Sequence, residues 1–385
     1  TFIYFNTLKG GKKNLDCTFY GVGKIGGLEF EKKEPLVPKD RFEIRKGQLT
    51  MRTVLGNGAF GIVRLGSFRI TQERAIDVAV KMLKDNPSTD DLKNFQHEIS
   101  LMKSAGHHQN IVSMIGCCTV DVARPMLIVE YCSRGDLQTY LRTVGSPLYA
   151  KCAVTYGREA PEPQQLANDF NKIAAYTLNT AEEQITVGEL LNFARQVASG
   201  MEFLSSNRII HRDLAARNVL LCEDKTVKIS DFGLSRDIYE ENVYKKQGNS
   251  RLPLKWMAIE ALTHQIYTTQ SDVWSFGILL WEIVTLGCNP YPETPTNMVL
   301  QLLKSGYRME KPENCGKELY DIMVSCWRST PHSRPNFTQL KHQLDNLLRT
   351  VNDNEYLNLY ELIREPSSRD SSKLIDKSYT NLCSA

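Results

Sequence analysis

Aliphatic residues lie on both sides of a glycine-rich stretch within residues 49–65, which predicts two strands joined by a glycine loop. A further strand is predicted at 126–129, where four apolar residues in a row lead into a polar segment. Between them, residues 87–104 repeat apolar positions at helical spacing, and Pro87 suits the first turn of that helix. We therefore expect the first part of the chain to be mainly β-sheet with one helix.

Helical spacing of apolar residues dominates the second half of the chain. It runs from Leu190 to Leu204, and it returns around 274–281 in a segment that is apolar nearly all round and is therefore predicted to be a buried helix. The last amphipathic helix is predicted at 340–348. Residues 143–186 lack this spacing, and so long a stretch inside a domain is usually functional or disordered. The pattern as a whole predicts an α+β protein.

Composition and charge exclude several classes of function. The 385 residues carry a formal net charge of +3, which favours neither nucleic acid nor an acidic partner. The ten cysteines are scattered without paired spacing, so reduced thiols are expected rather than disulfides or a zinc site. The sequence has no apolar run long enough to cross a bilayer.

The N-terminus has the character of a segment that leaves a membrane. Residues 1–5 are mostly apolar, and lysines follow at positions 9, 12 and 13, as is typical of the cytoplasmic end of a membrane helix. The first residue is Thr rather than Met, so we expect a fragment whose membrane span lies upstream. The alternative is the frayed terminus of a soluble protein.

The strongest chemical signal is a polar loop, His211-Arg212-Asp213-Leu214-Ala215-Ala216-Arg217-Asn218. Apolar residues precede it at 209–210 and follow it at 219–221, so two buried segments can hold the loop and direct Asp213 and Asn218 into a site. Thirteen residues after Asn218 comes Asp231-Phe232-Gly233. Two acidic residues and an amide are thereby expected near one another.

The glycine loop has the spacing Gly56-x-Gly58-x-x-Gly61-x-Val63. A dinucleotide-binding loop would open a helix and have an acid about 20 residues further on, where Asp77 stands. Gly61 runs instead into strand-like residues 62–65, and Lys81 follows on a strand of its own. This context favours a loop that covers phosphates between two strands.

In this order and spacing, the motifs resemble the protein kinase signature. The Ala-Ala-Arg form at 215–217 resembles tyrosine kinases, and residues 49–348 resemble receptor tyrosine kinases with a split kinase domain, the class of the fibroblast, platelet-derived and vascular endothelial growth factor receptors. The resemblance implies a two-lobed fold with a small, mainly antiparallel β lobe carrying one helix and a large, mainly helical lobe. It also implies ATP and Mg²⁺ as cofactors and protein tyrosine as substrate.

The resemblance assigns a role to each motif residue. Lys81, oriented by Glu98, is expected to contact the phosphates, and Asp213 is expected to accept or orient the substrate hydroxyl with Arg217 beside it. Asn218 and Asp231 offer hard oxygen ligands for Mg²⁺. The residues expected to line the ATP pocket are Gly56, Gly58, Phe60, Gly61, Val63, Ala79, Lys81, Val129, Glu130, Cys132 and Leu220.

Other residues match family positions that support the fold. A packing spine and its anchor are expected from Met102, His211, Phe232 and Asp272. An ion pair between Glu260 and Arg334 is expected to tie the segment after Asp231 to the large lobe. The family has Pro where this chain has Ile259, which leaves the path of that segment open.

Four tyrosines are candidate phosphorylation sites. Tyr239 and Tyr244 lie in the segment 231–260, where a phosphate of roughly −1.5 to −2 charge could pair with an arginine such as Arg212. Tyr356 and Tyr379 each begin a Tyr-x-Asn motif, which resembles a docking site for phosphotyrosine-binding adaptors. Tyr356 could instead pack against the large lobe.

We expect a juxtamembrane linker at 1–44, the small lobe at 45–132, the large lobe at 133–348 with a kinase insert at 143–186, and a tail at 349–385. The predicted function is phosphoryl transfer to protein tyrosine, including a second copy of the receptor, on the cytoplasmic side of the plasma membrane. A pseudokinase scaffold that displays phosphotyrosines and a soluble non-receptor tyrosine kinase are the alternatives.

Overall fold

The computed structural model describes residues 40–58, 61–144, 185–234, 236–237, 244–245 and 252–350. All of them except Asp40 belong to one compact unit, Arg41–Ala385. The predicted kinase insert, apart from its first and last two residues, lies outside the described residues, as do Phe60, Tyr239, Tyr356 and Tyr379. The same holds for most of the predicted linker and tail.

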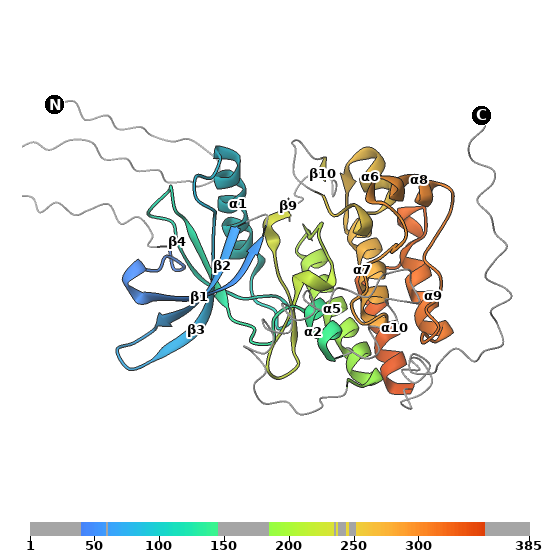
Figure 1. The fold of residues 1–385 in the computed structure, drawn as a ribbon, viewed down its shortest axis with the longest axis horizontal. Helices are drawn as coiled ribbons and strands as arrows, with labels where there is room; N and C mark the ends of the chain where they lie inside the picture. Colours follow the sequence, from blue (N-terminus) through green and yellow to red (C-terminus); the bar gives the residue numbers. More distant parts are fainter. Residues whose placement is uncertain are drawn as a thin grey trace, which may run out of the picture. The chain divides into compact units, whose positions relative to one another are not determined.

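A five-stranded antiparallel sheet forms the first part of this unit (Figure 1). Its strands run in the order β1-β2-β3-β5-β4. Their bounds are β1 Leu49–Gly58, β2 Gly61–Arg69, β3 Ala75–Met82, β4 Met114–Cys118 and β5 Met126–Glu130. The glycine motif therefore lies between two strands, as the sequence predicted, and Lys81 lies on the central strand β3.

One helix, α1 Thr89–Ala105, accompanies the sheet. Ser88 caps it: its hydroxyl accepts the N–H of Asp91, while the Asp91 carboxylate accepts the N–H of Ser88. Pro87 precedes this cap, so the prediction that it lies in the first turn was wrong; the Ser88 side chain satisfies an N-terminal donor that proline does not. The buried face includes Phe95, Glu98 and Met102.

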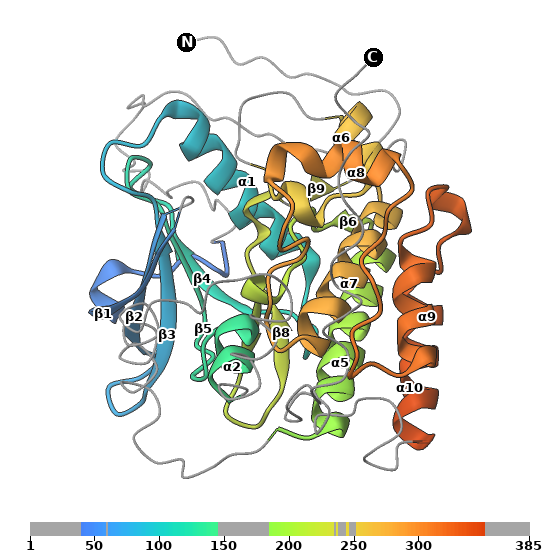
Figure 2. The same cartoon turned by 45° about the vertical axis from the view of Figure 1, so that its right-hand side comes forward.

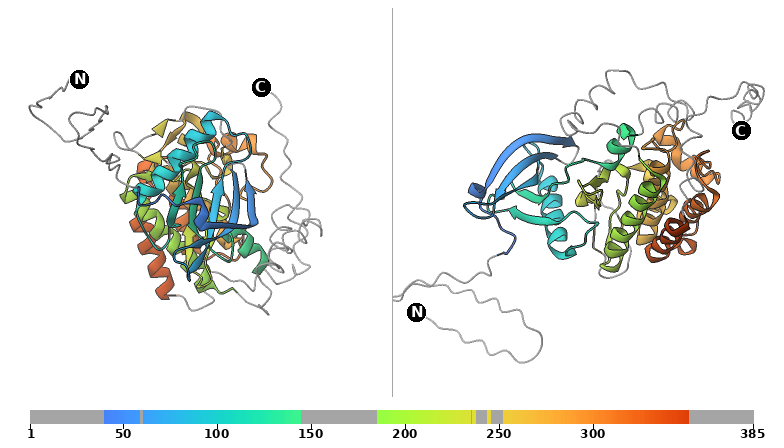
Figure 3. Two further views of the ribbon diagram at one scale, coloured as in Figure 1. Left: turned by 90° about the vertical axis from the view of Figure 1, so that its left-hand side faces the viewer. Right: turned by 90° about the horizontal axis from the view of Figure 1, so that it is seen from below.

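The second part is mainly helical (Figure 2). Its helices are α2 Leu137–Val144, α5 Val187–Ser206, α6 Ile259–His264, α7 Thr269–Val284, α8 Val299–Lys304, α9 Lys317–Cys326 and α10 Phe337–Thr350. Three two-stranded antiparallel pairs accompany them, β6 Ile209–Ile210 with β9 Arg236–Asp237, β7 Val219–Leu221 with β8 Val227–Ile229, and β10 Tyr244–Lys245 with β11 Ile266–Tyr267. The view from below in Figure 3 shows α5 and α10 side by side.

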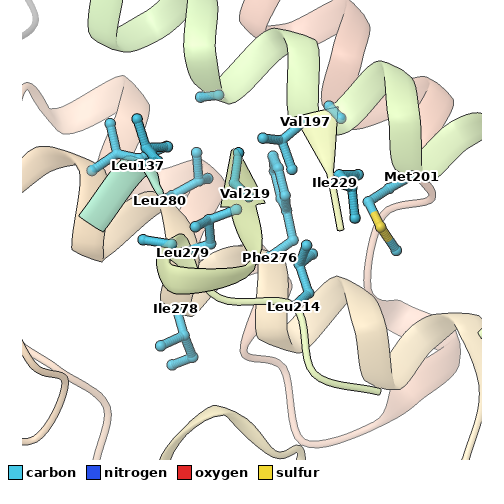
Figure 4. Packing of buried hydrophobic residues seen from close by; sticks show 14 of the residues in the cluster. Leu137, Val197, Met201, Leu214, Val219, Ile229, Phe276, Ile278, Leu279 and Leu280 are labelled. Carbon is cyan, nitrogen blue, oxygen red and sulfur yellow. The ribbon is translucent and has the colours of Figure 1, made fainter. Parts of the chain in front are cut away.

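Helix α7 is the centre of the helical core. Every residue from Ser271 to Val284 is buried, as the sequence predicted for an all-apolar helix. Figure 4 shows its apolar side chains packed with residues of the polar loop 211–218 and of β7, such as Leu214 and Val219. The loop between β6 and β7 is thereby fixed to the best-buried helix of the molecule.

Two apolar clusters cover opposite faces of the sheet. Val78, Val80 and Ile128 belong to a small cluster, whereas Leu127, which is next to Ile128 on β5 and pairs with Lys81, belongs to the large cluster shared with the helices. Successive side chains of a strand point to opposite faces of the sheet, so membership in one or the other cluster shows which face a strand residue lies on. Phe42 and Ile44, at the end of the predicted linker, form backbone hydrogen bonds with Cys117 of β4.

Within the part of the chain that the structure describes, none of the helices has both the length and the apolar character needed to cross a membrane.

Candidate active site

The register of the sheet aligns in rows the residues that are predicted to bind the nucleotide. Gly56 pairs with Val63, and Val63 pairs with Lys81 on the next strand. Ala79 pairs with Val129 of β5. Ala79 and Lys81 are two residues apart, so they and their pairing partners share one face of the sheet.

The three glycines of the loop differ in what they require. A side chain at Gly61 would bring Cβ to 2.2 Å from the Met82 carbonyl oxygen, and its φ of +143° also favours glycine. At Gly56 and Gly58 a Cβ would meet no atom within 4 Å. Gly61 is thus needed by the fold, whereas Gly56 and Gly58 leave open space that side chains would otherwise occupy.

Lys81 joins the sheet, helix α1 and the loop after β8. Its ammonium donates to Glu98 Oε1 at 2.6 Å and to Asp231 Oδ1 at 2.9 Å. Burial acts to lower the pKa of Lys81, but the charges of Glu98 and Asp231 outweigh it and raise that pKa. Burial likewise opposes ionisation of Asp231, yet Lys81 holds its pKa below the ordinary value. The predicted Lys81–Glu98 pair is therefore formed, and both the Lys81 ammonium and the Asp231 carboxylate are charged at neutral pH.

Backbone groups fix the start of the catalytic loop. The buried Asp272 of α7 accepts the N–H of His211 at 2.8 Å and that of Arg212 at 2.9 Å. Arg212 needs this support because its φ is +71°. The His211 ring lies edge-on to Phe232, with centroids 5.6 Å apart, and Nε2 lies 2.9 Å from the Ser230 carbonyl. The predicted anchor at Asp272 is present.

Asp213, Arg217 and Asn218 lie together in the loop. The Arg217 guanidinium donates to Asp213 Oδ1, and the Asn218 amide donates to the Asp213 carbonyl at 2.7 Å. Burial raises the pKa of Asp213 to about 6, although Arg217 opposes the shift. A carboxylate with a pKa in this range can accept a proton at neutral pH.

The segment between β8 and Asp231 is tied to the same loop. Ser230 donates through its N–H at 2.8 Å and its hydroxyl at 2.9 Å to the Asn218 carbonyl. Asp231 itself has a φ of +61°, a sparsely populated conformation that such contacts hold in place. Asn218 and Asp231, the two predicted metal ligands, are therefore held at adjoining points of one network.

Sequence reasoning missed Glu282. This fully buried residue of α7 accepts the Ala216 N–H at 3.0 Å and the Trp256 indole N–H at 2.9 Å, and the Arg217 guanidinium lies 4.3 Å from the Trp256 ring centre. Burial raises its pKa to about 7. A second acidic residue, besides Asp272, in a helix that is apolar nearly all round was the available signal.

The segment 231–260 ends at Glu260, which forms the expected ion pair with Arg334. Arg334 donates to its two carboxylate oxygens at 2.7 and 2.9 Å. Ile259 is the first residue of α6, with Ala258 at the N-cap in an extended conformation. The segment therefore enters a helix at the position where proline is favoured, and isoleucine occupies it without changing where the helix begins.

The remaining predicted residues lie around this centre. Glu130 ends β5, with its carboxylate 2.6 Å from the Ser113 N–H, and Cys132 follows in a segment that hydrogen-bonds to β7. Leu220 lies on β7 and bridges to Asp136. Tyr244 lies on β10, opposite Tyr267 of β11.

The arrangement defines a class of protein. Residues 49–344 match the family model described as protein tyrosine and serine/threonine kinase, so the chain belongs to that family. It is also 49% identical over 329 residues to the tyrosine-protein kinase receptor torso of Bombyx mori, across 83% of this chain and 40% of the relative. The chain thus spans about two fifths of the length of the curated relative that it matches.

The family match confirms the predicted two-lobed kinase fold. The identity to a tyrosine-protein kinase receptor agrees with the predicted resemblance to receptor tyrosine kinases. Members of the family use ATP and a divalent metal ion. The individual site residues, the choice of metal ion and the domain boundaries remain predictions.

Proposed function

We propose that this chain is the cytoplasmic catalytic part of a single-pass receptor, and that it transfers the γ-phosphoryl group of ATP to protein tyrosines, including those of a second copy. The observation that carries this proposal is the charged network of Lys81, Glu98 and Asp231, joined through Ser230 and Asn218 to Asp213. Phosphoryl transfer needs these same elements, a cation for the phosphates, oxygen ligands for metal, and a carboxylate for the hydroxyl.

The residues present suit a nucleotide with a magnesium ion. Gly56 and Gly58 leave space at the loop, and Lys81 lies in the same row of the sheet as Gly56 and Val63. Asp231 accepts hydrogen bonds from Lys81 and from the Gly233 N–H through Oδ1, so Oδ2 and the Asn218 amide oxygen are the proposed Mg²⁺ ligands. When bound, the ion would neutralise phosphate charge.

Asp213 is the proposed group for the substrate hydroxyl. Its carboxylate is held by Arg217, and Arg217 lies against Trp256 of the segment 253–257, which we assign as the platform for the tyrosine ring. The small residues Ala215 and Ala216 leave room for such a ring. A phenol has a pKa near 10, so positioning contributes more than full deprotonation before attack.

Regulation is proposed to act through tyrosines. Tyr244 and Tyr239 are the proposed activating sites, and Tyr379 and Tyr356 are the proposed docking sites for phosphotyrosine-binding adaptors. The proposed layout keeps the linker at 1–44 next to a membrane span and the insert at 143–186 within the large lobe. The relative named as a receptor supports this arrangement.

Phosphosite mapping tests the proposal. The purified chain would be incubated with Mg²⁺-ATP beside an Asp213→Asn control, and incorporated phosphate located by mass spectrometry. We expect phosphate on Tyr244 and tail tyrosines in the wild type only, with faster incorporation at higher chain concentration, as transfer between copies requires.

Two results would overturn it. No incorporation in either protein at high concentration would favour a pseudokinase scaffold. Phosphate confined to Ser or Thr would mean that residues 215–217 do not select tyrosine.

A further inference from the structure

Two thiols meet between the nucleotide region and the catalytic loop. Cys132 follows β5 in the hinge segment, residues 130–135, and Cys222 follows β7. Their sulfur atoms are 3.5 Å apart, although 90 residues separate them in the sequence. Cys326, by contrast, is fully buried inside the helical core.

The backbones around the two thiols are already held together. The Arg134 N–H donates to the Leu221 carbonyl at 3.0 Å, and the Leu221 N–H donates to the Gly135 carbonyl at 2.8 Å. A disulfide needs sulfur atoms about 2.05 Å apart, so closing the pair requires a movement of only about 1.5 Å. Side-chain rotation with a small shift of the hinge segment can supply most of that distance.

The two thiols differ in access and in acidity. Cys132 is 5% exposed, whereas Cys222 is partly exposed. The hydrogen bond with Cys132 holds the pKa of Cys222 below its ordinary value, against burial and with help from the charge of Lys228. The same hydrogen bond, together with burial, raises the pKa of Cys132. Cys222 is therefore the thiol that reacts first with an oxidant, and Cys132 beside it is the second partner.

We propose that Cys132 and Cys222 form a peroxide-reactive dithiol site whose disulfide links the hinge segment to the residue that follows β7. The Cys222 thiolate attacks the O–O bond of hydrogen peroxide, which gives a sulfenic acid and releases hydroxide. The Cys132 thiol then attacks that sulfur, which forms the S–S bond and releases water. In total two thiols lose two electrons, and one peroxide with two protons becomes two waters.

The consequence for the nucleotide rests on the function proposed above. Cys132 and Leu220, which is two residues before Cys222, are both assigned to the ATP pocket. Drawing the sulfurs together moves these two walls relative to each other, so the oxidised chain should bind ATP more weakly. We expect KM for ATP to rise at least threefold, while kcat changes less than twofold, and we expect a thiol reductant to reverse the effect.

The test uses the full chain and does not depend on catalysis for its first readout. The chain would be treated with hydrogen peroxide, free thiols blocked with N-ethylmaleimide, and peptides mapped without reduction. The expected result is a Cys132–Cys222 cross-link, with Cys315 still reduced and therefore alkylated once the chain is unfolded for blocking, because burial raises the pKa of that thiol to about 12 and protects it from peroxide. No cross-link, or Cys222 oxidised alone to sulfinic acid, would overturn the dithiol site.

Kinetics with Cys222→Ser tests the consequence. Cys222 is outside the assigned pocket, so this variant should keep its KM for ATP under reducing conditions and lose the response to peroxide. An unchanged KM in the cross-linked wild type, or an equal rise in Cys222→Ser, would overturn the link to the nucleotide. A chain that cross-links but transfers no phosphate would contradict the proposed function alone, and nucleotide binding could then be measured by fluorescence.

Discussion

Burial and charge act in opposite directions on the acidic residues of this site. Asp231 stays fully ionised because Lys81 compensates its burial, whereas the pKa of Asp213 is raised to about 6 because Arg217 compensates only in part. Two carboxylates with separated pKa values suit separate roles, one as a metal ligand and one as a proton acceptor.

The raised pKa of Asp213 predicts an acid limb in the activity. The ionised carboxylate is the proton acceptor, so kcat/KM should fall about tenfold per pH unit below pH 6 and level off above it. Initial rates with a tyrosine peptide from pH 5 to 8, with circular dichroism at each pH to verify folding, would measure this limb.

Asp213→Asn is the matched control for that limb. It should lower kcat by about 10²- to 10⁴-fold and make the residual rate independent of pH. If the residual rate kept the same limb, the titrating group would be another one, such as Asp272, whose pKa burial also raises to about 6.

Glu282 predicts a pH dependence of stability. Its pKa is raised by burial from 4.5 to about 7, so the folded protein binds a proton more tightly than the unfolded chain does. The stabilisation is fully present below pH 4.5 and is lost as pH rises through 7, by about 3 kcal/mol on the scale of 1.36 kcal/mol per pKa unit.

Glu282→Gln should remove this dependence. The Gln oxygen can still accept from Ala216 and Trp256. The thermal unfolding midpoint of the variant, relative to that of the wild type, should therefore rise between pH 5 and pH 8. Glu202→Gln is the comparison, because the hydrogen bond from Lys341 lowers the pKa of Glu202 and the variant should show a small change of opposite sign. Parallel curves for Glu282→Gln and wild type would refute the assignment.

At the residue scale, the motifs predicted which side chains meet. Lys81 met Glu98, and Asp272 supported the loop, because the family pattern constrains these types at these spacings. Glu282 was missed because its partners, Ala216 and Trp256, come from two other segments of the chain. A hydrophobic pattern can indicate that a helix is buried without indicating what an acid such as Glu282 contacts.

At the scale of secondary-structure elements, the first residue of helix α6 shows what the start of a helix requires. The N–H of the first helical residue has no partner within its own helix, so α6 tolerates several residues at Ile259. Ala258 has φ −68° and ψ 157°, the conformation that a residue before proline adopts.

Ile259→Pro should therefore be accepted. We expect activity within about twofold of wild type and stability within about 1 kcal/mol, because the fixed φ of proline suits the first helical position and offsets the loss of side-chain packing. Leu262→Pro is the control: it removes the hydrogen bond from the Leu262 N–H to the Ala258 carbonyl and should cost about 3 kcal/mol or more. Thermal unfolding and phosphate incorporation would be measured for both, and equal effects would contradict this account.

At the element scale, periodicity predicted the helices and strands better than their ends. The buried helix at α7 and the paired strands around the glycine loop followed from apolar spacing alone. The start of α1 was misplaced because the Ser88 side chain, not Pro87, caps the helix. Residues 42 and 44 were predicted as linker, and they pair with β4 through backbone groups that leave no pattern in the sequence.

At the scale of the whole molecule, Lys81 links the sheet to the helical part. Its two ion pairs connect β3, α1 and the loop after β8, so the sheet and the helical part share one buried charge network. Asp231 is the member of this network that a metal-bound nucleotide would also engage. Nucleotide binding should therefore depend on the metal ion and on this carboxylate together.

Thermal unfolding with ligands tests that coupling. Mg²⁺-ATP at 100 times its Kd should stabilise the wild type by about 2.7 kcal/mol, and ATP with a chelator should stabilise it much less. Asp231→Asn can still accept a hydrogen bond from Lys81 but offers the metal a neutral, weaker ligand, so its unfolding midpoint should be nearly the same with and without Mg²⁺. Asp321→Asn, which alters an exposed pair with Lys317, should behave like the wild type. A metal-dependent shift that survived in Asp231→Asn would place the ion on other ligands and remove Asp231 from the proposed site.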